Sequence, residues 1–224
     1  MLLAIATATH MMSLALHDEH NLLAERTWET HNQHTTELAP AIRALLAGAR
    51  VEVAALTALA VCVGPGTYTG LRIGVALAKG LASARGLPLV GLTTMDILAA
   101  AQPQSTGGLV TVARAGRGRI ITATYQWRKG RWLNRGDVRL MDWPTLLASI
   151  DGPAAIAGEI DADGHAALEE ARADGVPITI VGSAHRLRRA GFLAQEALHM
   201  LADNPSSHAA DKVMPVYVQT KDTP

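Results

Sequence analysis

The sequence predicts an α/β fold, because hydrophobic runs of strand type come first and helical spacing then alternates with further strands. The first three runs favour β-strands: residues 2–8, residues 11–17 and a run that ends at Trp28. Beyond them, the spacing predicts helices over about 33–47, 71–84 and 93–101, with buried strands over 56–63 and 89–92. An antiparallel meander that continues into strand–helix–strand crossovers is typical of the mixed five-stranded sheet of the ribonuclease H-like and actin-like (ASKHA) class.

The second half of the chain repeats this style less clearly, after a segment from Gln102 to Gly108 that is rich in turn-forming residues. A chain of 224 residues is long enough for one large domain or two small ones. We therefore predict two subdomains, residues 1–104 and 105–224, each with a mixed sheet flanked by helices. The tail, about 205–224, is expected to pack back on the first subdomain.

Composition excludes several function classes. Twenty basic residues balance twenty acidic residues, so no net field attracts nucleic acid or acidic lipid to the whole molecule. The single cysteine, Cys62, lies in an apolar run and cannot form an internal disulfide, which favours a core position in a reducing compartment. Because no apolar run reaches the roughly 18 residues that a membrane helix needs, we expect a cytoplasmic protein without membrane contact.

The most informative segment begins at Gly64 and reads GPGTYTGLRIGVALAKGL. A Gly-rich loop between a strand and a helix can hold phosphate, but this spacing fits neither the P-loop nor the dinucleotide fingerprint. An ordinary tight turn is a second interpretation. We favour a third, in which small residues at every fourth position form one helix face that another helix can approach closely: Gly66, Gly70, Gly74 and Ala78. Glycine costs a helix about 1 kcal/mol against alanine, so this face needs a compensating contact, which a bulky residue at Gly74 should block without unfolding the chain.

This segment, continued through Pro88 to Gly91, closely resembles the signature of the TsaB (YeaZ) family. Two further segments are similar to the same family: His34 to Pro40, at the start of the first helix, and Met214 to Val218, near the end of the chain. The resemblance covers about residues 1–100 and only scattered positions after them. It implies an actin-like fold and a role in making threonylcarbamoyladenosine, the modification beside the anticodon of tRNAs that read ANN codons.

The resemblance also implies how the chain works. It would be a non-catalytic scaffold that activates a catalytic TsaD-like paralogue, together with a TsaE-like ATPase, and it would reach tRNA only through that complex. It would carry no cofactor or metal, leave ATP to the interface of the complex, and form a homodimer when alone. The partner surface would be built from the first two helices, with these contact residues: His34, Leu38, Ile42, Gly70, Ile73, Gly74, Leu77, Ala78 and Leu81. The structural loop of the motif comprises Gly64, Pro65, Gly66, Thr67, Tyr68, Thr69 and Arg72.

Two positions depart from the family pattern. Ala6 stands where actin-like phosphotransferases place an aspartate after the first strand, and the run from Arg114 to Ile121 lacks the acidic residues of the corresponding family segment. Both changes count against binding of a metal–nucleotide complex at these positions. The alternative function is an actin-like ATP-binding enzyme that uses the Gly64–Gly70 loop for phosphate, and a metalloprotease is a third hypothesis without a supporting metal constellation.

Two clusters of side chains remain. His31 and His34 are not spaced as a helical metal pair and have no obvious third ligand, so solvated or capping histidines are favoured over a metal site. Arginines and aromatic residues are interleaved over residues 114–135, a composition that can contact RNA. Because the net charge is near zero, we favour a solvated hairpin face for this stretch, whose basic residues are Arg114, Arg117, Arg119, Arg128, Lys129, Arg131 and Arg135.

Overall fold

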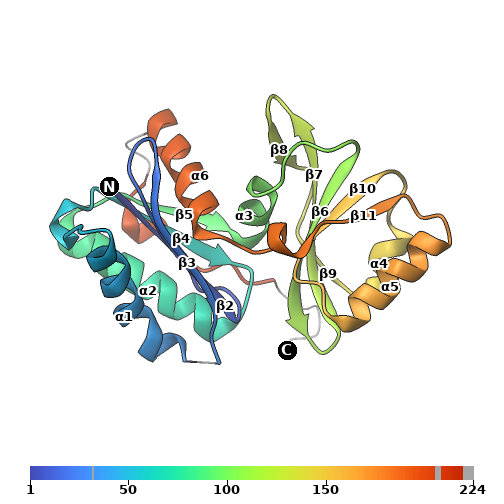
Figure 1. Cartoon of the computed structure of the whole chain (residues 1–224), viewed down its shortest axis with the longest axis horizontal. Coiled ribbons are helices and arrows are strands. Elements are labelled where there is room, and N and C mark those ends of the chain that lie inside the picture. The colour runs from blue at the N-terminus through green and yellow to red at the C-terminus, as the bar shows by residue number, and fades with distance from the viewer. Residues whose placement is uncertain (32, 205–207, 219–224) are drawn as a thin grey trace. The chain divides into compact units, whose positions relative to one another are not determined.

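The computed structural model describes residues 1–31, 33–204 and 208–218, and the chain forms two compact units (Figure 1). Among the described residues, the first unit comprises those within 1–97 and 188–216, and the second comprises those within 98–187 and 217–218. The sequence predicts a division after residue 104, whereas the first unit ends at residue 97. The prediction also leaves residues 188–203 in the second subdomain, although they belong to the first unit. Of the predicted tail, residues 205–207 and 219–224 lie outside the described part of the chain.

A five-stranded mixed sheet forms the first unit, as the sequence predicts. Its strand order is β3 (Leu22–Glu29), β2 (Met11–His17), β1 (Leu2–Ala6), β4 (Ala58–Gly64) and β5 (Leu89–Thr93). The first three strands pair antiparallel, whereas β4 runs parallel to β1 and β5 runs parallel to β4. Strand β1 is therefore central, and all five of its residues are buried. Cys62 on β4 is buried, as predicted.

Helices cover both faces of this sheet. Helices α1 (His34–Gly48) and α2 (Tyr68–Arg85) lie on one face, and α6 (Ala190–Asp203) lies on the other (Figure 1). Alternate residues of a strand point to opposite faces, so Ile5 joins the core beneath α1 and α2, whereas Ala6 joins the core beneath α6. The core beneath α6 is rich in alanine, which allows this helix to lie close to the sheet.

The chain after α6 returns along the first unit. The Leu89 amide donates to the His208 carbonyl at 2.9 Å, and the Val216 amide donates to the Val63 carbonyl at 2.7 Å. On α2, the side chain of Lys79 donates from Nζ to the carbonyl of Val213 at 3.0 Å. Residues 208–216 of the tail therefore pack against β4, β5 and α2, whereas residues 217 and 218 belong to the second unit.

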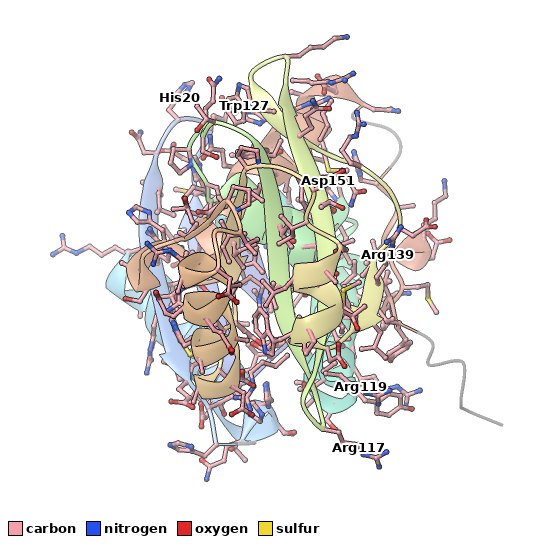
Figure 2. All side chains as sticks on the ribbon, turned by 90° about the vertical axis from the view of Figure 1, so that its right-hand side faces the viewer. His20, Arg117, Arg119, Trp127, Arg139 and Asp151 are labelled. Carbon is pink, nitrogen blue, oxygen red and sulfur yellow. The ribbon has the colours of Figure 1, made fainter. Side chains whose placement is uncertain are left out.

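The second unit is built on a six-stranded sheet. Its order is β11 (Ile178–Ile180), β10 (Ala154–Gly158), β6 (Gly108–Gly116), β7 (Arg119–Arg128) and β8 (Arg131–Asn134), and β9 (Arg139–Met141) also pairs with β7. Helices α4 (Trp143–Ala148) and α5 (Ala162–Ala173) pack on the sheet through a common core. Figure 2 looks onto this unit, with Arg117 and Arg119 at the turn between β6 and β7 and Arg139 on β9.

Shorter elements complete the two units. Helix α3 (Thr94–Ala100) carries the chain from the first unit into the second. Short 3-10 helices span Val53–Ala55, Ser183–His185 and Ala210–Lys212. Within residues 1–31, 33–204 and 208–218, every helix is too short or too polar to cross a membrane. Two mixed sheets flanked by helices agree with the predicted fold class.

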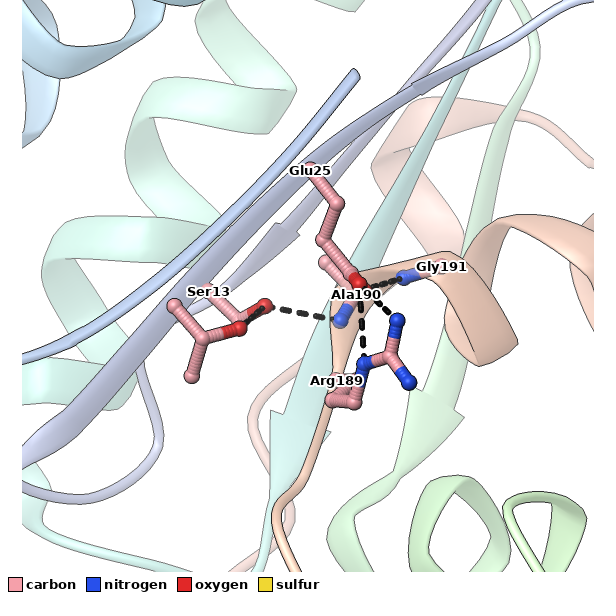
Figure 3. Close-up of polar contacts among 6 residues, drawn as sticks. Ser13, Glu25, Arg189, Ala190 and Gly191 are labelled. Carbon is pink, nitrogen blue, oxygen red and sulfur yellow. Dashed lines mark hydrogen bonds and ion pairs between the residues drawn. The ribbon is translucent and has the colours of Figure 1, made fainter. Parts of the chain in front are cut away.

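A polar network attaches the start of α6 to the hairpin of β2 and β3 (Figure 3). The Glu25 carboxylate accepts hydrogen bonds from the Gly191 amide at 2.7 Å and from Arg189 Nε at 2.8 Å. The Ser13 hydroxyl accepts one from the Ala190 amide at 2.8 Å. Acceptors at a helix N-terminus satisfy its free amides, and a carboxylate there also interacts favourably with the helix dipole. These bonds join segments that are far apart in the sequence. The order of elements along the chain does not reveal them, which is why the sequence alone places this helix in the second subdomain.

Replacing Glu25 with alanine is expected to lower the free energy of unfolding by about 1–3 kcal/mol, because the Gly191 amide and the Arg189 guanidinium lose their acceptor. The Glu25 side chain is only 12% exposed, so water cannot fully replace the carboxylate. Thermal unfolding followed by circular dichroism measures the change. The matched control is Glu29→Ala, at the exposed end of the same strand; equal stability of the two variants would show that the network does not hold α6.

Candidate functional site

The loop that follows β4 is held against the end of β1. The Thr67 amide donates to the Ala8 carbonyl at 2.7 Å. A Cβ atom at Gly66 would lie 2.0 Å from that carbonyl oxygen, and one at Gly64 would lie 2.6 Å from the Val216 carbonyl oxygen. Gly64 also has a φ of +103°, which residues with a side chain rarely adopt. Close contacts within the chain therefore explain the glycines of this loop.

The small-residue face of α2 packs on the segment that follows β1. A Cβ atom at Gly70 would lie 2.2 Å from the Thr7 carbonyl oxygen, and one at Gly74 would lie 2.1 Å from the Thr7 hydroxyl. That hydroxyl donates to the Gly70 carbonyl at 2.8 Å, and Ala78 on the same face is fully buried. The spacing correctly predicts a close backbone approach. The expectation that another helix makes it is wrong, because the neighbour is the end of a strand in the same chain.

Three predicted contact residues on α1 also face inward. His34, Leu38 and Ile42 are 4%, 1% and 6% exposed, and the two aliphatic residues belong to the core beneath the helix. The His34 Nε2 atom lies 3.1 Å from the Thr9 carbonyl oxygen. His34 is therefore a buried structural residue, and not the solvated or capping residue that the sequence favours. Like the small-residue face of α2, these side chains are covered by the chain itself. They lie beneath the helix surface on which a partner was expected to bind.

The opposite side of α2 is open. Ala76, Gly80 and Ala84 are exposed and recur every fourth residue. Each follows a residue of the buried small-residue face by two positions in the sequence. Residues two apart on a helix point in nearly opposite directions. A Cβ atom at Gly80 would meet nothing within 4 Å. Of the predicted contact residues, the half-buried ones lie beside this series: Ile73, Leu77 and Leu81. We define the open face of α2 as Ile73, Ala76, Leu77, Gly80 and Ala84.

Three residues of the predicted loop are exposed at the start of α2, namely Tyr68, Thr69 and Arg72. The Tyr68 ring is stacked by the Arg72 guanidinium, whose carbon lies 4.3 Å from the ring centroid. This is the geometry of a cation–π contact. Tyrosine and arginine are enriched in protein interfaces, so this pair makes the first turn of α2 a suitable border for a binding surface.

The end of β1 is apolar and lies near a buried cation. Ala6, where the family pattern has aspartate, is fully buried. Three residues further on, the Thr9 hydroxyl accepts a hydrogen bond from Arg188 Nη1 at 3.2 Å, and the Met11 carbonyl accepts one from Arg188 Nη2. Arg188 is only 3% exposed, and its Nε has no partner among the described residues. A guanidinium with neutral partners repels a divalent cation, so this end of β1 is unsuited to a metal–nucleotide complex.

The second departure from the family pattern, Arg114, is exposed at the end of β6. Its Nε lies 3.8 Å from the Asp161 carboxylate, and its amide donates to Glu159 at 3.1 Å. His31 is exposed before α1, whereas His34 is buried. In the part of the chain that the structure describes, no three His, Cys, Asp or Glu residues are placed to hold a metal ion. Neither departure thus creates an evident metal site.

Comparisons with known proteins give the chain close relatives. The family model described as TsaD, tRNA N6-adenosine threonylcarbamoyltransferase, matches residues 22–139. The Bacillus subtilis protein named tRNA threonylcarbamoyladenosine biosynthesis protein TsaB is 32% identical over 160 residues, which are 70% of each chain. The Escherichia coli protein of the same name is 32% identical over 127 residues, which are 56% of this chain and 54% of that protein.

Solved structures agree with this comparison. YeaZ from Pseudomonas aeruginosa superposes with a TM-score of 0.76 and 24% identity, over 97% of this chain and 99% of that chain. A Bacteroides thetaiotaomicron protein with an actin-like ATPase fold superposes with a TM-score of 0.51 and 9% identity, over 88% and 95% of the two chains. These structures confirm the predicted actin-like fold. The family match and the identity to the B. subtilis protein show that the chain belongs to the TsaB (YeaZ) family.

Proposed function

We propose that the chain is a non-catalytic scaffold subunit that pairs with a TsaD-type catalytic paralogue to make threonylcarbamoyladenosine beside the anticodon of tRNAs that read ANN codons. Its family supports the pathway, because the B. subtilis and E. coli relatives are named for threonylcarbamoyladenosine biosynthesis. The observation that carries the pairing is the open face of α2, where no neighbour among the described residues requires a glycine at position 80.

The position of Gly80 is unfavourable without a contact from outside the chain. Glycine in a helix interior costs about 1 kcal/mol relative to alanine, and the space around Gly80 would accept a larger side chain. With Ala76 and Ala84 on either side, Gly80 forms a shallow surface on which a second helix can pack backbone to backbone. Ile73 and Leu77 add apolar area beside it. We infer that a partner helix supplies the missing contact.

A TsaD-type paralogue fits this surface because its helices would be related to those of the chain. The TsaD family model matches residues 22–139, a range that includes both α1 and α2. Two related helix faces can pack on each other across an approximate two-fold axis, as in an isologous dimer. By the same reasoning, two copies of this chain would pair when the paralogue is absent. A TsaE-like ATPase would join the assembled pair, and tRNA would bind to the assembly.

A non-catalytic role is supported by the end of β1. Buried Ala6 offers no carboxylate, and Arg188 places a positive charge beside the turn that follows. The Gly64–Gly70 loop gives little support to a phosphate site, because Gly66 and Gly70 lie against the Ala8 and Thr7 carbonyl groups. We therefore place ATP at the interface of the complex and none on this chain.

The test of the proposed function is the tRNA of cells depleted of this chain. We expect the threonylcarbamoyladenosine content of hydrolysed tRNA, measured by mass spectrometry of nucleosides, to fall strongly and to return when the wild-type chain is supplied. Rescue by Ala166→Leu, an exposed substitution on α5, but not by Gly80→Leu would connect the activity to the open face of α2. An unchanged content of the modified nucleoside after depletion would overturn the proposal.

A further inference from the structure

Basic and acidic residues of the second unit are segregated along the chain. From Arg114 to Arg139 there are eight arginine and lysine residues and a single acidic residue, Asp137. From residue 140 to residue 187 there are eight acidic residues and only two arginines. The chain has no net charge as a whole, but this stretch is strongly positive. The net charge of the whole chain therefore does not exclude binding of an anionic partner here.

The pairing of β7 with β8 brings three of these arginines to one face of the sheet. Residues directly opposite each other on paired strands share a face. Arg128 stands opposite Arg131, and Gln126, two residues earlier on β7, shares their face. Arg135 follows β8, and its Nη1 atom donates to Gln126 Oε1 at 2.7 Å. Arg128, Arg131 and Arg135 therefore point to the same side of this hairpin.

Strand β9 extends the same arrangement along the edge of the sheet. Arg139 stands opposite Thr122, which precedes Arg128 by six residues on β7, so both arginines share a face. In Figure 2, Arg139 lies above Arg117 and Arg119, which mark the far end of β7. We define the cationic strip as Arg128, Arg131, Arg135 and Arg139.

The charges of the cationic strip are not neutralised within the chain. Like charges that face each other on paired strands destabilise a sheet, and Arg128 faces Arg131 in this way. Among the residues that the structure describes, no ion pair includes a member of the strip, and Asp137 pairs with none of them. A bound polyanion would offset this repulsion, and the arrangement along one edge suits a linear polyanion.

We propose that the cationic strip binds the phosphate backbone of RNA and, resting on the proposed function, that this RNA is the tRNA to be modified. Arginine suits phosphate because its planar guanidinium can donate two parallel hydrogen bonds. Peripheral membrane binding usually adds insertion of apolar side chains, but strands β7, β8 and β9 expose no large hydrophobic side chain, and the exposed ones of the second unit, Leu187 and Tyr217, lie on other segments. The observations therefore favour RNA over a lipid surface.

Contacts of the strip are to phosphate and not to bases. The aromatic residues of the hairpin, Trp127 and Trp132, stand opposite each other on the other face. Their rings pack edge to face, with centroids 5.3 Å apart, so neither is stacked as an open platform beside the strip. Phosphate contacts add affinity that depends on salt and carries no sequence information. The chain would thus help the assembled complex to hold tRNA, while recognition of the anticodon region lies elsewhere.

The test is tRNA binding by the assembled pair of this chain and the TsaD-type protein, with the chain alone measured in parallel. Fluorescence anisotropy follows a labelled tRNA transcript that reads an ANN codon. We expect Arg128→Gln/Arg131→Gln to weaken binding about tenfold at ~0.1 M salt and to reduce the slope of log K against log salt by about 1.4–1.8. The same double variant is expected to weaken the binding of a tRNA with another anticodon by the same factor.

The matched control removes two exposed positive charges outside the strip, in Arg172→Gln/Lys212→Gln. Equal loss in both double variants, or no loss in the strip variant, would overturn the proposal. Binding to phosphatidylserine vesicles that only the strip variant loses, with tRNA binding unchanged, would also overturn it and assign the strip to membranes. Light scattering distinguishes the two hypotheses. If the strip variant forms an intact pair and binds tRNA with unchanged affinity, only the proposal that the strip binds RNA is overturned. If the wild-type chain forms no pair with the TsaD-type protein, the proposed function is overturned.

Discussion

Replacing Gly74 with leucine is expected to destabilise the first unit strongly. The added Cβ would lie 2.1 Å from the hydroxyl of Thr7, which is fully buried and already bonded to the Gly70 carbonyl. Neither side can yield easily, because β1 is the central strand and α2 packs directly over its end. Overpacking and the loss of a buried hydrogen bond together cost about 3–5 kcal/mol. For a chain of this size the Tm is then expected to fall by about 6–20 °C.

Thermal unfolding followed by circular dichroism measures this change. The sequence alone predicts a different outcome for the same variant, namely a folded monomer that has lost its partner, because spacing does not reveal that the strand end of the same chain covers Gly74. A Tm as high as that of the wild type would contradict the packing described for α2. The matched control is Gly80→Leu, which makes the same substitution on the open side of the same helix.

Gly80→Leu is expected to leave the chain folded and to abolish binding to the TsaD-type partner. Leucine is a better helix former than glycine by about 0.8 kcal/mol, and a Cβ at this position meets nothing within 4 Å. On a helix face that packs backbone to backbone, however, a leucine side chain forces the two helices apart. A loss of about 3 kcal/mol or more at the centre of an interface weakens the Kd at least about 100-fold.

Isothermal titration calorimetry with the TsaD-type protein measures this Kd, and the Tm of the variant shows that folding is intact. Ala166→Leu is the control, because it adds a leucine at an exposed position of a helix in the second unit. Wild-type affinity is expected for that control. If Gly80→Leu also bound with wild-type affinity, the open face of α2 would not be the pairing surface.

The fold of the first unit could be predicted because its signals are local. Short apolar runs mark β1 and β2, and the change to helical spacing at α1 marks the end of the meander. The place of α6 could not be predicted in this way. It depends on the bonds of Glu25 and Ser13 to residues 189–191, which pair segments from opposite ends of the chain.

The candidate site was predicted only in part, and α2 shows why. Its sequence holds two series of small residues at every fourth position, one through Gly74 and one through Gly80. Periodicity places the two series on opposite sides of the helix, but it does not say which side meets the sheet. That depends on Thr7, which approaches Gly70 and Gly74 only after the strand and the helix have packed. The predicted contact residues on α2 therefore include Gly70, Gly74 and Ala78, which the chain itself covers.

The most direct test of the scaffold hypothesis is the solution mass of the chain alone and mixed with the TsaD-type protein of the same organism. Light scattering after gel filtration measures it under varied salt, with and without nucleotide. We predict a homodimer for the chain alone and a one-to-one complex in the mixture, formed without any nucleotide bound to this chain. Two separate proteins that never co-elute, under any of these conditions, would contradict the central claim.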